Sequence, residues 1–149
     1  MRNVAVEVDD ILINITGDSI LRTCVVDPSV LPARVNQHVA IVRAADGIPP
    51  RFLHLYLAQP STKAHLLGND AGGSRPAITK GHLELLPVLL PSQPVLNAFK
   101  SLTEPWFALI SKNNSENQTL TNLRDLLLPK LMSGEIRMKN AEKQIEEAL

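Results

Sequence analysis

The chain has 149 residues, with 15 basic and 15 acidic side chains and therefore no formal net charge at pH 7. Its hydrophobic share of 44% suits a globular domain, while an aromatic share of 3% leaves the core to aliphatic side chains. The single cysteine, Cys24, excludes an internal disulfide, no apolar run approaches the roughly 20 residues of a membrane span, and the first residues lack the apolar core of a signal peptide. We therefore expect a cytoplasmic protein.

The middle of the chain is more basic than the whole. Residues 22–80 hold seven basic side chains against three acidic ones, although zero net charge taken alone argues against a nucleic-acid binder. The local excess would suit a surface that faces phosphates. An ordinary solvated surface explains the same charges and is favoured when charge is considered alone.

Short β-branched segments dominate the first part of the chain. Residues 4–16 alternate apolar and polar side chains, which predicts one or two strands. A turn at Gly17–Ser19 separates them from a strand predicted at 20–26, and a further strand is predicted at 38–43. This spacing indicates a small, twisted, mostly antiparallel sheet.

Helical spacing follows. Pro50 opens a predicted helix that Pro60 ends. A second helix is predicted from Ser61 to Leu67, with Ser61 as its N-cap. Residues 82–90 indicate a short turn followed by a buried strand, which Pro91 stops.

A long helix is predicted from Ser92 to about Met132, ended by Ser133-Gly134. Its apolar residues recur three or four positions apart, the spacing of a coiled-coil seam; they are Phe99, Leu102, Trp106 and Leu109, then Leu120, Leu123, Leu127 and Leu131. The tail Ile136–Leu149 is charged and weakly helical. Together the patterns predict an α+β fold: a small β-rich domain with short helices, followed by one long C-terminal coiled-coil helix.

The polar stretch at residues 111–118 admits two interpretations: a loop between two helices, or the middle of one helix. We expect one helix, because the stretch lacks Gly and Pro and the heptad register continues through it, with Asn113 and Asn117 in the seam. Pro105 and Pro129 are weak points, since each removes one backbone hydrogen bond.

Motifs for catalysis and metal binding are missing from the sequence. No glycine-rich phosphate loop or amino-methyltransferase signature occurs. The four histidines have no metal-ligand spacing with Cys24 or with carboxylates; they are His38, His54, His65 and His82. We therefore expect neither catalytic residues nor a metal site.

Residues 120–138 read LTNLRDLLLPKLMSGEIRM and resemble, at nearly every position, the conserved helix near the end of type I restriction-modification specificity subunits. Shorter motifs upstream are similar to the same family, and the resemblance spans roughly residues 9–138. These motifs are Asp10-Ile11-Leu12 with Gly17, Asn36-Gln37-His38-Val39, Asp46-Gly47-Ile48 through Tyr56-Leu57, and Gly72-Gly73-Ser74 with Ile78, Leu83 and Leu90-Pro91.

The chain departs from the family pattern in two ways. Asp9 stands where a glycine is usual and Leu21 near where a second turn glycine often lies, so the first turn is expected to differ in shape. A whole subunit of the family also has two recognition domains, two long helices and several dozen more residues before Asp10. We therefore expect a fragment or the product of a truncated gene.

The resemblance implies a non-catalytic DNA specificity subunit that reads one half of a bipartite site. It divides the chain into a partial target-recognition domain at 1–91, a spacer and dimerisation helix at 92–134 and a charged tail at 135–149. Methyltransferase (M) and restriction (R) subunits would be the partners, and would carry the S-adenosylmethionine and ATP. The family's long helices pair as an antiparallel coiled coil. Because a partner helix is missing here, we expect an exposed seam and homodimerisation.

Candidate DNA contacts follow from the chemistry of base and phosphate recognition. Bidentate Arg, Gln or Asn side chains suit base edges, whereas Lys, Arg, Ser, Thr and backbone amides suit phosphates. The candidates are Thr16, Arg22, Gln37, Ser74, Arg75 and Lys80. A surface or turn role explains each of them equally well. Two other functions stay open: a coiled-coil protein-interaction module, which zero net charge favours slightly, and the recognition tail of a fused restriction-methyltransferase.

Overall fold

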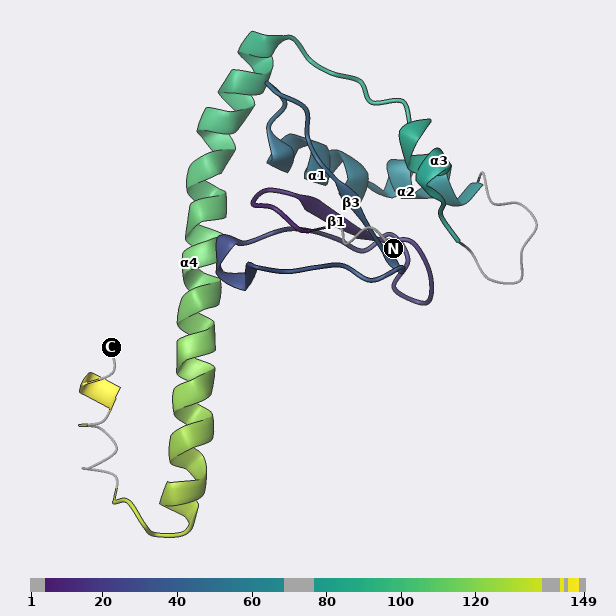
Figure 1. Ribbon diagram of the computed structural model, residues 1–149. Helices are drawn as coiled ribbons and strands as arrows, with labels where there is room; N and C mark the ends of the chain where they lie inside the picture. Colours follow the sequence, from purple (N-terminus) through teal and green to yellow (C-terminus); the bar gives the residue numbers. More distant parts are fainter. Residues whose placement is uncertain (1–4, 69–76, 138–142, 144, 148–149) are drawn as a thin grey trace. The chain divides into compact units, whose positions relative to one another are not determined.

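The computed structural model describes residues 5–68, 77–137, 143 and 145–147. They belong to two compact units, residues 1–103 and residues 104–149. A three-stranded sheet and short helices make up the first unit, and one long helix starts there and continues through the second (Figure 1). The predicted α+β fold is confirmed.

The sheet is antiparallel, with strand β1 (Ile11–Asn14) in the centre. Strands β2 (Thr23–Val25) and β3 (Val39–Val42) pair with its two edges. All three fall inside the segments predicted as strands, although each is shorter than predicted. The alternation in β1 turns Ile11 and Ile13 into the core, where both are fully buried.

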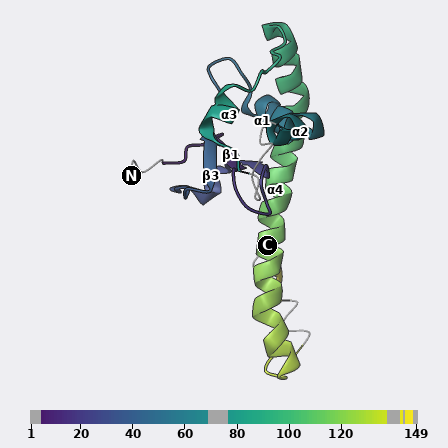
Figure 2. The ribbon, with the colours of Figure 1, turned by 90° about the vertical axis from the view of Figure 1, so that its right-hand side faces the viewer.

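The core of the first unit is aliphatic, as the composition requires. Ile13, Leu21, Leu66 and Ile78 form one buried cluster drawn from separate parts of the chain. Helix α1 (Pro50–Ala58) packs against β2 and beside helix α2 (Pro60–Gly68), so the two helices cover one side of the sheet (Figure 2).

The predicted start of α2 is wrong by one residue. The helix begins at Pro60, and the amide of Lys63 donates to the carbonyl of Gln59 at 3.0 Å. Ser61 therefore lies in the first turn and is not the N-cap. The physical reason is that the fixed φ of Pro60 suits the first position of a helix. Pro60 directly follows Gln59, the C-cap of α1, so α2 begins without an intervening residue.

The strand predicted within residues 82–90 is also wrong. A short helix, α3 (Lys80–Glu84), is capped by Thr79, and the chain beyond it is extended but pairs with no strand in the described part of the molecule. Leu85 and Leu89 are 83% and 85% exposed. Pro87 and Pro91 lack amide donors, which weakens any strand pairing along this segment.

Helix α4 runs from Gln93 to Met132 without a break. The prediction that residues 111–118 are helical is confirmed, and the helix continues through Pro105 and Pro129. Its 40 residues span about 60 Å at 1.5 Å per residue. Gly134, with φ of +74°, follows the end of α4 as predicted. Most of the predicted weak helix in the tail lies outside the described residues.

Two non-glycine residues near the ends of β1 have left-handed backbone conformations. Leu21 has φ of +61° and is buried, and Asp9 has φ of +65°. Leu21 donates its amide to the carbonyl of Asn14, whose own amide donates to Arg22, so two residues face one across the hairpin. This is a bulge whose first position favours glycine. Asp9 and Leu21 thus keep a glycine-like backbone at the two positions where the resemblance led us to expect glycine.

Replacing Asp9 by glycine should stabilise the chain by about 0.5 to 1 kcal/mol, because glycine relieves the left-handed strain at a position without buried side-chain contacts. Denaturant unfolding followed by circular dichroism measures the change. Asp9→Ala is the matched control, since it removes the same carboxylate but keeps a Cβ atom. If the glycine variant were no more stable than the alanine variant, the backbone of Asp9 would not be strained.

Candidate nucleic-acid interface

The candidate interface lies at one end of the sheet, which we call the turn end. β1 finishes there at Asn14, while β2 begins there at Thr23 and β3 begins there at Val39. Because neighbouring strands are antiparallel, the turn at 15–22 and the segment at 36–38 both extend from this end of the sheet.

Backbone hydrogen bonds join three segments at this end. The amide of Ile15 donates to the carbonyl of His38 at 2.9 Å, and the carbonyl of Ile15 accepts from the amide of Ile78 at 2.8 Å. An antiparallel bridge between Thr16 and Ala77 adds to this connection. Residues 15–16, 38 and 77–78 are therefore held side by side despite their distance in sequence.

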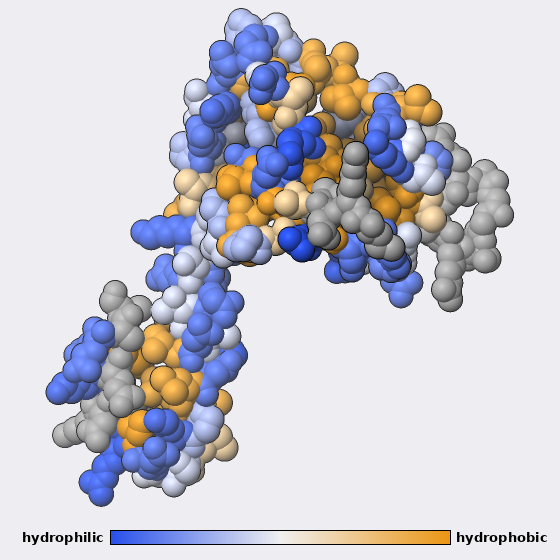
Figure 3. Space-filling view, viewed as in Figure 1, coloured by the Kyte–Doolittle hydropathy of each residue, from blue (hydrophilic) through white to orange (hydrophobic). Residues whose placement is uncertain are grey.

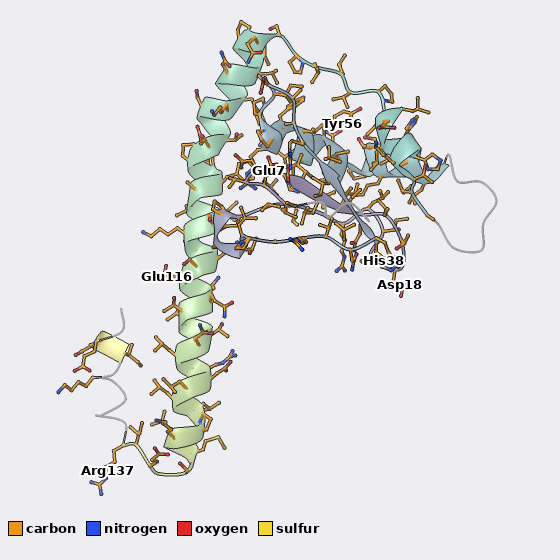
Figure 4. The ribbon with its side chains drawn as sticks, viewed as in Figure 1. Glu7, Asp18, His38, Tyr56, Glu116 and Arg137 are labelled. Atoms are coloured by element: carbon orange, nitrogen blue, oxygen red, sulfur yellow. The ribbon has the colours of Figure 1, made fainter. Side chains whose placement is uncertain are left out.

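Polar side chains follow the same junction. Thr16 Oγ1 lies 2.8 Å from His38 Nδ1, and the amide of His38 donates to Asn36 Oδ1 at 2.9 Å. His38 and Asp18 lie at this end of the sheet in Figure 4. The bulge at Leu21 precedes Arg22 directly, and bulges commonly redirect side chains beside functional sites.

The structure brings three of the predicted DNA contacts to the turn end: Thr16, Arg22 and Gln37. Lys80 starts α3 two residues after Ile78, and its Nζ lies 3.1 Å from Glu84 Oε1. Arg22 and Gln37 are exposed, and no carboxylate pairs with Arg22 in the described part of the chain. The other two candidates, Ser74 and Arg75, lie outside the described residues. All six assignments stay predictions.

The sequence analysis missed an ion-pair cluster at the opposite end of β1. Arg43 donates to both carboxylate oxygens of Asp10, with Nε 2.7 Å from Oδ1 and Nη2 2.8 Å from Oδ2. Asp10 also accepts the amide of Glu7, while Arg43 Nη1 lies 2.8 Å from Glu7 Oε1. Asp10 and Arg43 are 33 residues apart, so no local pattern indicates their contact. Arg43 is thereby engaged within the fold, which reduces the positive excess predicted for residues 22–80.

Asp10 is a buried carboxylate that needs compensation for its charge. Its side chain is 1% exposed, and the guanidinium of Arg43 lowers its pKa despite the opposing effect of burial. The carboxylate in turn raises the pKa of Arg43. Arg43 is therefore the main group that stabilises the buried negative charge of Asp10, and the amide of Glu7 adds to it.

Two histidines, His54 and His82, have surroundings that belong to helices α1 and α3. His54 is half-buried on α1, its Nδ1 is buried without a partner among the described residues, and burial lowers its pKa. His82 instead completes the cap of α3 with Thr79. No three His, Cys, Asp or Glu side chains of the described residues gather in a way that could hold a metal ion.

The predicted seam of α4 is only partly exposed. In the first unit, Phe99 packs edge-to-face on Phe52 with ring centroids 5.7 Å apart. In the second unit, Leu127 is 5% exposed, so the expectation of a fully exposed seam is wrong at this residue. Apolar surface gathers over the C-terminal half of α4 (Figure 3), where Leu120, Leu126, Leu128 and Met132 are exposed. Of the predicted seam, the exposed residues are Leu102, Trp106, Leu109 and Leu120. No helix of the described residues is long and apolar enough to cross a membrane.

Comparison with known proteins assigns the chain to a class. No family model matches it. It is 31% identical over 106 residues to the specificity subunit of the type I restriction enzyme HindI from Haemophilus influenzae, covering 70% of this chain and 23% of that protein. It is 37% identical over 68 residues to the MjaIX specificity subunit of Methanocaldococcus jannaschii, covering 46% and 16%.

The chain is therefore homologous to part of the type I restriction enzyme specificity subunits, which confirms the family that the sequence motifs indicated. It spans less than a quarter of the length of each of these two relatives.

The Arg43–Asp10 pair predicts an asymmetry between two substitutions. Asp10→Asn should destabilise the chain by about 1.5 kcal/mol, which is the lower end of the range for a hydrogen bond to a charged group. Arg43→Gln should destabilise it more, because it leaves a buried carboxylate without its counter-charge, whereas Asp10→Asn leaves a half-exposed guanidinium.

The pH dependence of the free energy of unfolding gives a second test of this pair. Because the folded-state pKa of Asp10 is lowered, its stabilisation is present above the unfolded-state pKa of about 4 and is lost as the pH falls through the folded-state value. Denaturant unfolding from neutral to acidic pH measures both effects. An Asp10→Asn variant that kept the full acid sensitivity of the wild type would contradict the assignment.

Proposed function

We propose that this chain is the DNA sequence-recognition component of a type I restriction-modification complex, with residues 1–91 reading one half of a bipartite site. The observation that carries this proposal is the similarity over 106 residues to a protein named as a specificity subunit. The recognition surface is the turn end of the sheet.

The geometry of the turn end supports this role. Thr16, Arg22 and Gln37 extend from loops anchored on a rigid sheet, an arrangement that suits contacts with base edges and phosphates. The nearest described acidic side chain on the hairpin is Asp18, and the buried Asp10 is neutralised at the other end of β1. Of these two carboxylates only Asp18 would face phosphates at this surface, and Arg22 carries the opposite charge in the same turn.

Helix α4 has a different part in the proposal. An uninterrupted helix of 40 residues is stiff, so that residues 92–134 would set the spacing between two DNA readers by their length. M and R subunits would assemble on the same subunit in the cytoplasm. We assign S-adenosylmethionine and ATP to those partners, and neither a cofactor nor a catalytic step to this chain.

A protein-interaction module remains the second candidate, because Leu102, Trp106 and Leu109 are exposed on one helix. Such a module would bind protein alone. A recognition tail of a fused restriction-methyltransferase is the third, but both relatives are named as specificity subunits, and neither name includes a methyltransferase.

DNA binding separates these candidates. The chain should bind random duplex DNA with an affinity that falls steeply with salt, because phosphate contacts release counterions. Arg22→Gln should weaken binding about tenfold, which corresponds to about 1.4 kcal/mol for one charged contact. Fluorescence anisotropy across a salt series measures both.

The matched control is Arg124→Gln, which removes the same charge from an exposed position on α4. It should leave the affinity nearly unchanged. Equal losses for the two variants would mean that net charge alone drives binding, and a wild-type chain without salt-dependent binding would contradict the proposed function.

Homodimerisation through α4 is the second test. A double substitution of exposed seam residues, Leu109→Asp with Leu120→Asp, should abolish the dimer at micromolar concentration while the sheet stays folded. Burying charged carboxylates in an apolar seam is strongly unfavourable. Leu127 is unsuitable because its burial within the chain makes unfolding the expected result.

Analytical ultracentrifugation measures the dimer, and Asn114→Asp with Gln118→Asp adds the same charge outside the seam as a control. A strictly monomeric wild-type chain, or a control pair that dissociates as readily as the seam pair, would contradict a dimer formed by this seam.

A further inference from the structure

The contact between Thr16 and His38 joins two segments at the surface of the turn end. Thr16 Oγ1 lies 2.8 Å from His38 Nδ1, although the residues are 22 positions apart. His38 was not among the DNA contacts expected from the sequence. His38 lies at the same end of the sheet as Asp18 (Figure 4), which belongs to the turn that also carries Arg22.

Backbone hydrogen bonds hold both residues of this pair. The carbonyl of His38 accepts from Ile15, the neighbour of Thr16, and its amide donates to Asn36 Oδ1. Thr16 is bridged to Ala77 on its other side. A side chain held this way loses little conformational entropy when a ligand binds, which is what a specific contact requires.

The hydroxyl of Thr16 also orients the imidazole ring. With Nδ1 engaged by Thr16, Nε2 is the remaining polar atom, and it makes no hydrogen bond within the described part of the chain. Nε2 is a donor in the cation and in one of the two neutral tautomers. When the Thr16 hydroxyl donates to Nδ1, the neutral ring carries its proton on Nε2 and presents that donor outward.

We propose that His38, with its ring oriented by Thr16, is a specificity-determining residue that reads a purine of the DNA half-site through Nε2. The inference rests on the proposed function and extends it to one residue pair. Guanine and adenine both present the N7 acceptor in the major groove, and guanine adds O6 beside it. Cytosine presents a donor there, which repels the Nε2 donor. Thymine presents the O4 acceptor beside its C5-methyl group, so a thymine selected at this position would overturn the assignment to a purine.

A binding-site selection tests this inference on the full chain. Wild-type protein selects duplexes from a randomised pool, and affinities are then measured for the selected site with each position changed in turn. His38→Ala should lower discrimination about fivefold to tenfold at one purine position and leave the other positions unchanged. The salt dependence should stay unchanged, because a base contact releases no counterions.

Two further variants separate orientation from folding. Thr16→Val removes the hydroxyl but keeps the side-chain shape, and should relax the same position as His38→Ala. Thr16→Ser keeps the hydroxyl and should retain the wild-type preference. His38→Phe keeps a planar ring without nitrogen and should behave as His38→Ala, while His65→Ala on α2 is the matched histidine control and should change nothing.

Each outcome has a distinct meaning. A wild-type chain that binds no DNA, or binds without sequence preference, overturns the proposed function and this inference with it. A wild-type preference that His38→Ala and His38→Phe both leave intact overturns the inference alone. So does a uniform loss at every position with a smaller salt slope, which would make His38 a phosphate contact.

Discussion

The pairing of β1 on both of its edges is the constraint on which the rest of the first unit depends. Four residues, Ile11–Asn14, supply the centre of the sheet and two of its fully buried side chains. Strands as short as these are stable only when a hydrophobic face is covered, and α2 and the segment around Ile78 provide that cover. The turn end proposed to contact DNA, with Thr16, Arg22, Gln37 and His38, extends from one end of this small sheet.

Near each end of β1, one residue is in a state that is unfavourable by itself and that the surrounding fold compensates. At one end the buried charge of Asp10 requires Arg43, and at the other Leu21 adopts a backbone conformation that favours glycine. Leu21 tolerates this because its side chain is buried in the core. The hydrophobic contact thus compensates for backbone strain at the base of the turn that carries Thr16 and Arg22.

Helix α4 is continuous through a segment whose residues have modest helix propensity. Its middle, residues 111–118, is polar on every side and includes asparagine and serine, which are modest helix formers. The side-chain amide of Gln118 donates to Asn122 Oδ1 and the hydroxyl of Thr119 donates to the carbonyl of Ser115, so polar groups one turn apart are paired along the surface.

Periodicity in the sequence by itself determined the class of fold, the positions of three strands and two helices, and the long helix, because these follow from local spacing of apolar residues and from proline and glycine. The run at residues 120–138 likewise indicated the family without any structure. Local pattern failed at residues 82–90, where an apolar run resembles a buried strand but finds no partner edge. Only the tertiary structure decided which distant residues meet: Asp10 with Arg43, Thr16 with His38, and Ile15 with Ile78. Contacts between residues more than 20 positions apart depend on how the strands pair, and no short window of sequence encodes that pairing.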